Sequence, residues 1–182
     1  MITHIPKILY DNKITEVLDD IKYNYGKLTR RGYIYGLIAI DQDAKIIAID
    51  SRFDRRLNYW DLSSIGAALY GVARQGQDFF ETEELERASL IYHDMRLFVK
   101  SIGQVELQKK GNRDILVVVL TDSEVNLGVI ILQMSRFASK IKDEIEKNQK
   151  INETLHMSEI EIKNHINKLK KEIFKDKIGS IS

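Results

Sequence analysis

The feature that most constrains the fold is an uninterrupted apolar run, Ile-Leu-Val-Val-Val-Leu, from Ile115 to Leu120. A strand alternates its side chains between two faces, so a run without a polar residue belongs to a strand that is covered on both faces. The segment from Tyr33 to Ile40 is also apolar on both alternations, with Ile34, Ile38 and Ile40 on one side and Tyr35, Leu37 and Ala39 on the other. We expect these two strands to be neighbours in the middle of a sheet.

Three segments have apolar residues at helical spacing. The first follows a cap at Asp11 or Asn12, the second follows a cap at Asp61, and the third begins near Asn126 or Leu127. The apolar stripes are Ile14, Val17, Leu18, Ile21, Tyr25 and Leu28; then Leu62, Ile65, Leu69 and Val72; then Ile130, Met134, Phe137, Ala138, Ile141 and Ile145.

Three further strands complete the pattern. A turn at 41–44 leads to a returning strand at 45–50, and segments 85–93 and 96–105 form a second hairpin. The resulting order is helix, two strands, helix, three strands, helix. This order predicts an α/β (α+β) fold in which a five-stranded antiparallel sheet is sandwiched between helices.

The chain divides into a domain at 1–150 and a C-terminal helical extension at 151–182. Ser158 and Glu161 match the capping box that begins a helix. The apolar residues that follow form a narrow seam at four, three and four spacing: Ile162, Ile166, Leu169 and Ile173. Such a seam is typical of a helix that lies against one partner, so these residues are candidates for partner binding.

The second predicted helix has an unusual opposite face, which carries Gly66, Ala67 and Gly71. Each interior glycine costs a helix about 1 kcal/mol relative to alanine. Small residues at this spacing let another backbone come close, so we interpret this face as a second packing surface. The alternative is that the helix ends early, at Gly71.

Composition excludes several classes of function. With 28 Lys+Arg against 27 Asp+Glu the formal charge is +1, so no global field selects nucleic acid or an anionic membrane. The chain has no cysteine, and no run approaches the ~20 apolar residues of a membrane helix. We expect a cytoplasmic protein without membrane insertion and without nucleic acid as a partner.

The sequence carries no common catalytic motif. The glycine-rich phosphate loops and the nucleophile elbow are missing, and the histidines are scattered: His4, His93, His156 and His165. Acidic pairs such as Asp19–Asp20 and Glu83–Glu84 are adjacent, where side chains diverge into solvent. We expect no catalytic residue, no cofactor and no metal.

One basic cluster stands out, formed by Arg52, Arg55 and Arg56 with Arg30 and Arg31. Guanidinium groups of this kind bind phosphates and acidic partners, so the first three are candidates for partner binding. Three interleaved aspartates dilute the charge. The alternative interpretation is a solvated loop and an edge strand protected by charge.

Segment 121–130, Thr-Asp-Ser-Glu-Val-Asn-Leu-Gly-Val-Ile, follows the apolar strand and begins a long amphipathic helix. It resembles the Asn-Leu-Gly turn of the Roadblock dynein-light-chain family. Segment 36–41 resembles the first strand of that family, and segment 65–73 resembles its central helix with small residues. The resemblance covers the chain from Lys13 to Ile145.

This resemblance implies a homodimer, or a heterodimer with another Roadblock protein, in which central helices pack together and edge strands pair. The interface residues would be Gly66, Ala67, Tyr70, Gly71, Ala88, Leu90 and Tyr92. It also implies small Ras-like GTPases or dynein intermediate chains as partners. The family has no catalytic residue to carry over, so the expected function is that of a non-enzymatic adaptor or regulator.

Two other functions fit the same element order. The first is a small-molecule sensor resembling PAS or GAF domains, which would have a pocket of roughly 300 Å³ or more between sheet and helix. The second is a structural subunit of a larger complex of the dynein or scaffold type. Binding to a GTPase in its GTP and GDP forms separates the adaptor from the structural subunit.

Overall fold

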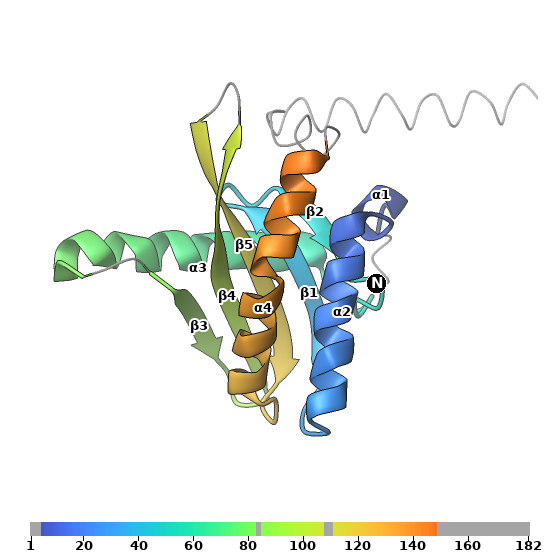
Figure 1. Ribbon diagram of the computed structural model, residues 1–182. Helices are drawn as coiled ribbons and strands as arrows, with labels where there is room; N and C mark the ends of the chain where they lie inside the picture. Colours follow the sequence, from blue (N-terminus) through green and yellow to red (C-terminus); the bar gives the residue numbers. More distant parts are fainter. Residues whose placement is uncertain (1–4, 83–84, 108–110, 149–182) are drawn as a thin grey trace, which may run out of the picture.

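A five-stranded antiparallel sheet with the strand order β2-β1-β5-β4-β3 forms the centre of the protein (Figure 1). The computed structural model describes residues 5–82, 85–107 and 111–148. In chain order the elements are α1 (Lys7–Tyr10), α2 (Lys13–Leu28), β1 (Ile34–Asp41), β2 (Ile46–Ile49), α3 (Tyr59–Phe80), β3 (Arg87–Ile91), β4 (Met95–Leu107), β5 (Gly111–Asp122) and α4 (Leu127–Lys147). Helices α2 and α4 cover one face and α3 crosses the other, which confirms the predicted sandwich.

The two apolar strands are central neighbours, as expected. Strand β1 pairs with β5 along most of its length, for example Leu37 with Val119. Val117 and Val119 point toward α2 and α4, whereas Leu116 and Val118 point toward α3. All four are completely inaccessible to solvent, so the continuous apolar run reflects coverage on both faces.

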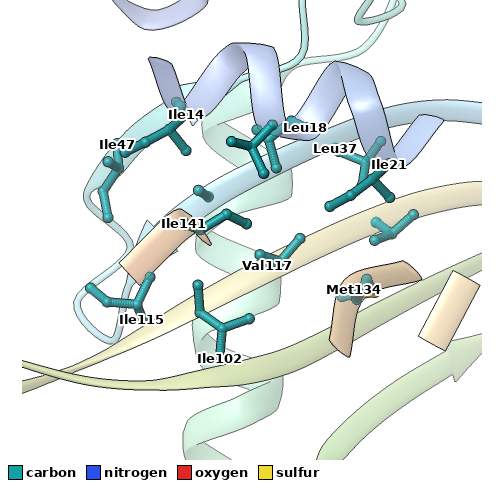
Figure 2. Packing of buried hydrophobic residues seen from close by; sticks show 14 of the residues in the cluster. Ile14, Leu18, Ile21, Leu37, Ile47, Ile102, Ile115, Val117, Met134 and Ile141 are labelled. Carbon is teal, nitrogen blue, oxygen red and sulfur yellow. The ribbon is translucent and has the colours of Figure 1, made fainter. Parts of the chain in front are cut away.

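Helices α2 and α4 pack on the sheet through the apolar residues that their periodicity predicts. Figure 2 shows Leu18 and Ile21 of α2 and Met134 of α4 meeting Leu37 and Val117 of the sheet. The side-chain oxygen of Asn12 accepts hydrogen bonds from the backbone N–H groups of the first turn of α2, at 3.0 Å each. This N-cap confirms the second of the two predicted caps.

Strand β1 departs from the predicted alternation at its start. Ile34 packs with the α2–α4 cluster, whereas Tyr35 packs on the α3 side with Ile38 and Ile40. The register between β1 and β5 shifts between Ile34 and Gly36, and such a bulge reverses the facing of residues on one side of it. The predicted faces of Ile34 and Tyr35 are therefore wrong, while the rest of the strand is as predicted.

The turn between β1 and β2 holds Ala44 in a left-handed conformation, with φ of 64°. Asp41 stabilises the turn, because its Oδ1 accepts hydrogen bonds from the backbone N–H groups of Asp43 and Lys45, each at 2.9 Å. Burial raises the pKa of the Asp41 carboxyl. The turn therefore keeps its shape through a buried aspartate although it lacks glycine at the left-handed position.

Replacing Ala44 with glycine is expected to stabilise the protein by roughly 0.5–1 kcal/mol, because the left-handed conformation strains a residue with a Cβ and not a glycine. Urea denaturation measures the change. The same substitution at Ala48, which is fully buried in β2, is the matched control and should destabilise the protein. If Ala44→Gly lowered the free energy of unfolding, the left-handed backbone at Ala44 would not be strained.

Helix α3 begins before the predicted cap at Asp61 and continues beyond Gly71, where the alternative prediction ended it. The side chain of Asn58, not Asp61, caps it, and its Oδ1 accepts a hydrogen bond from the Trp60 N–H at 3.0 Å. The helix continues through Gly71 to Phe80, so the alternative of an early end is wrong. Sequence periodicity missed the first turn because Tyr59, which is buried there, lies outside the predicted stripe.

The C-terminal extension at 151–182 lies outside the described residues. This applies to the capping box at Ser158 and Glu161 and to the partner-binding seam: Ile162, Ile166, Leu169 and Ile173. The domain division near residue 150 and the docking of this segment stay predictions.

Candidate interaction surfaces

Helix α3 exposes an apolar stripe on the side that faces away from the sheet. Ile65, Val72 and Phe79 have exposed fractions of 45%, 70% and 82%, and their spacing of seven places them along one face of the helix. Ala68 lies between the first two and is also exposed. Apolar residues that line one helix face at the surface, rather than scattering singly, mark an interaction site.

The sheet-facing side of α3 carries the small residues instead. A Cβ added to Gly66 would lie 2.5 Å from a methyl group of Val118, so the glycine lets α3 approach the central strand β5. Ala67 and Tyr70 are buried on the same side. Gly66, Ala67 and Tyr70 are therefore covered within this chain, and their contact with a second chain stays a prediction.

Both faces of α3 are apolar, which explains the reversed assignment. The predicted core stripe includes Ile65 and Val72, which are exposed, whereas the predicted outer face includes Gly66, which is buried. The signal in the sequence is a glycine that permits close approach, and it does not say whether a helix or a sheet approaches. Gly71 is exposed and a Cβ there would meet nothing within 4 Å, so it stays a candidate interface residue.

A salt bridge holds the middle of α3 in place. Arg74 pairs with Asp114 of β5, whose side chain is 3% exposed. The backbone N–H of Asp114 donates a hydrogen bond to Oε1 of Gln42, in the turn after β1, at 3.0 Å. Helix, sheet and turn are thus linked, and the outer stripe of α3 has a defined position.

Strand β3 forms an open edge of the sheet. Within the described residues it pairs with β4 alone, so the hydrogen-bonding groups of its other edge have no strand partner there. The opposite edge strand, β2, is buried at every position and is contacted by α1 and α2. Figure 1 shows that the C-terminal part of α3 extends past β3. The open edge of β3 and the C-terminal part of α3 therefore lie on the same side of the molecule.

The predicted interface residues of this strand differ in exposure. Ala88 is 8% exposed and packs inside the chain, and its role in the interface stays a prediction. Leu90 is half-buried against the α3-side cluster, and Tyr92, just after the strand, is 52% exposed. Ile91, which no sequence pattern marks as an interface residue, is 74% exposed. Leu90 and Tyr92 stay candidates, and Ile91 joins them.

The predicted arginine cluster occupies the connection between β2 and α3. Arg52 and Arg55 are exposed and make no ion pair in the described part of the chain, whereas Arg56 binds Asp54 at 2.6 Å. The hydrogen bonds from Arg56 lower the pKa of the Asp54 carboxyl to about 2. Arg30 and Arg31 are exposed in a different turn, the one between α2 and β1.

The described residues hold no group of three or more side chains suited to binding a metal ion. Their buried carboxylates serve structural roles. Asp50, fully buried, accepts a hydrogen bond from the Leu37 N–H at 2.7 Å and one from Lys22 Nζ at 3.1 Å. Burial raises the pKa of this carboxyl. Asp50 thus joins β1, α2 and the arginine-bearing connection.

Every helix of the described residues is too short or too polar to cross a lipid bilayer.

No family model matches the sequence, and no curated protein matches it. Solved structures do. A Roadblock/LC7 domain from Streptomyces avermitilis is 13% identical with a TM-score of 0.55, covering 71% of this chain and 94% of its own. The gliding protein MglB from Thermus thermophilus is 14% identical with a TM-score of 0.58, covering 80% and 100%. Myxococcus xanthus MglB is 15% identical with a TM-score of 0.53, covering 75% and 94%. The chain has the Roadblock fold.

Proposed function

We propose that this Roadblock-fold chain is a dimeric adaptor that binds a small Ras-like GTPase and supplies no catalytic group of its own. The observation that supports it best is the exposed apolar stripe of α3 beside the open edge of β3. An unpaired strand edge invites pairing with another strand, and an apolar helix face gains free energy when it is covered. A second copy, or another Roadblock protein, offers both.

The two features suit one interface. Pairing of β3 with the same strand of a second copy would extend the sheet across the dimer. The C-terminal ends of α3 in the two copies would then lie close together beyond β3, and contact between their outer stripes would cover Val72 and Phe79. The opposite edge, β2, is already covered, so the geometry favours a closed dimer over an open chain of copies.

The GTPase as a partner rests on the resemblance of the sequence to the Roadblock family and on the shared fold. Two of the similar structures are MglB proteins, one of them described as a gliding protein. The sequence has no phosphate-binding loop of its own, so this chain would act on the nucleotide cycle of a partner through surface contacts.

The test is binding of the purified protein to purified small GTPases from the same proteome, each loaded with a GTP analogue or with GDP. We expect at least one GTPase to bind with a preference for one nucleotide state. Binding that ignores the nucleotide would favour a structural subunit, and failure of every GTPase in both states would reject the proposed partner class.

Alanine at Arg52, Arg55 or Arg56 is expected to leave stimulated GTP hydrolysis within a few-fold of wild type. An exposed charge pair contributes ~1 kcal/mol or less, so the main change should be a modest loss of affinity. Single-turnover hydrolysis at saturating adaptor measures the effect. If one arginine entered the active site of the GTPase, its loss would lower stimulated hydrolysis by about 10³-fold or more, which would overturn the non-catalytic role.

A further inference from the structure

The connection between β2 and α3, residues 51–58, is held rigidly although it lies at the surface. Phe53 is buried, and its ring packs so closely on Gly36 that a Cβ there would lie 2.3 Å from it. The Asp54 N–H donates to the carbonyl of Tyr35 at 2.9 Å, and the Leu57 N–H donates to the carbonyl of Asp54 at 2.9 Å. We call residues 51–58 the arginine loop. A surface loop anchored in this way loses little conformational freedom on binding.

The side chains of Asp50 and Asp54 hold the backbone of this loop at two of its arginines. Asp50 accepts a hydrogen bond from the Arg52 N–H at 3.1 Å, and Asp54 accepts one from the Arg56 N–H at 3.0 Å. The aspartate side chains are 0% and 14% exposed, whereas the side chain of Arg56 is 81% exposed. The acidic groups therefore lie inward and the guanidinium groups point outward. Residues 51–58 hold three arginines and one aspartate, a formal charge of +2, and the loop therefore presents a positive outer surface.

Aromatic side chains flank the arginine loop. Tyr33 is 53% exposed, stacks edge-on against Tyr35 with ring centres 5.3 Å apart, and lies 5.8 Å from Lys22 Nζ. That ammonium also donates to the carbonyl of Arg52 at 2.9 Å, which places Tyr33 beside the loop. Trp60, in the first turn of α3 directly after the loop, is 46% exposed. Arginine, tyrosine and tryptophan are the residue types that most often dominate the energy of protein interfaces.

We propose that the arginine loop, with Tyr33 and Trp60 beside it, is a docking surface for an acidic segment of a protein partner. Arg52 and Arg55 supply guanidinium groups that no acid of the described residues neutralises, and carboxylates are their complementary ligands. Nucleic acid is disfavoured, because tight phosphate-backbone binding draws on many cations and the whole chain has a net charge of +1.

This surface is separate from the one proposed for pairing. The arginine loop follows β2, at the opposite edge of the sheet from β3. In a dimer joined at β3, each copy would keep its arginine loop at an outer end. An acidic segment could therefore bind the arginine loop whether or not α3 pairs and whether or not the partner is a GTPase.

The probe is a labelled poly-glutamate peptide of about 15 residues, measured by fluorescence anisotropy at an ionic strength of about 0.05 M. Trp60 is the one tryptophan of the chain, so its emission reports directly on the docking surface. We expect the peptide to bind and to change the Trp60 emission. The double variant Arg52→Glu/Arg55→Glu should weaken binding by about tenfold or more, because two attractive charges become repulsive.

The matched control reverses two exposed charges of α4, as Arg136→Glu/Lys147→Glu, and should change the affinity by no more than about twofold. Circular dichroism confirms that both variants are folded. The proposal is overturned if the peptide does not bind, if both double variants weaken binding equally, or if Trp60 emission is unchanged on binding. A dT15 oligonucleotide that binds more tightly than the peptide, through the same arginines, would also overturn it in favour of a nucleic-acid partner.

Discussion

Val72→Glu is expected to convert the proposed dimer into a folded monomer. Val72 lies in the centre of the outer stripe of α3 and its side chain is 70% exposed in the single chain. The substitution therefore leaves the fold intact, but it would place an unpaired carboxylate inside the proposed interface. Burying such a charge is costly, so the dissociation constant of the dimer should rise by about 100-fold or more. Light scattering with size-exclusion chromatography measures the mass.

The matched control is Leu132→Glu, because Leu132 is an apolar residue that is 61% exposed on α4, on the other side of the sheet. It should leave the mass unchanged. A dimer that survives Val72→Glu would exclude the outer face of α3 from the interface. If the wild-type protein alone stays monomeric at high concentration, the homodimer is wrong, and the same measurement with a second Roadblock-fold protein tests the heterodimer.

Gly66→Val is expected to lower the free energy of unfolding by about 3 kcal/mol, at the upper end of the range for overpacked cores. The added Cβ would lie 2.5 Å from a methyl of Val118. That valine is fully buried on β5, which β1 and β4 flank on both sides, so it has little room to recede. Helix α3 would have to move off the sheet, and urea denaturation measures the loss.

Gly71→Ala tests the opposite environment on the same helix. A Cβ at Gly71 meets nothing within 4 Å, so the alanine should stabilise the protein by about 1 kcal/mol through its better helix propensity. If both substitutions stabilise the protein, the close approach of α3 to β5 is wrong. If both destabilise it by similar amounts, the exposed environment of Gly71 is wrong.

The surfaces were harder to predict than the core. Arg52, Arg55 and Arg56 stand out in the sequence, but the inward position of Asp54 depends on hydrogen bonds that form only when the loop packs against β1. Ile91 gives no signal at all, because an exposed isoleucine next to Leu90 looks like part of an ordinary buried strand. Its exposure follows from the position of β3 at the edge of the sheet.

The layers of this fold follow from the pattern of apolar residues alone. The apolar run at 115–120 requires coverage on both faces of its strand, and α2 has apolar residues on one side only. Each of these elements can therefore be buried in one way. Helix α3 is different, because Ile65 and Val72 on one side and Ala67 and Tyr70 on the other are both apolar enough to be buried. The spacing of apolar residues shows which sides of a helix are hydrophobic, but not whether the side chains there fit against the sheet. The choice between the two sides came from packing in the folded protein. The large side chains of the central strands leave so little room beneath α3 that only the side with Gly66 can approach them.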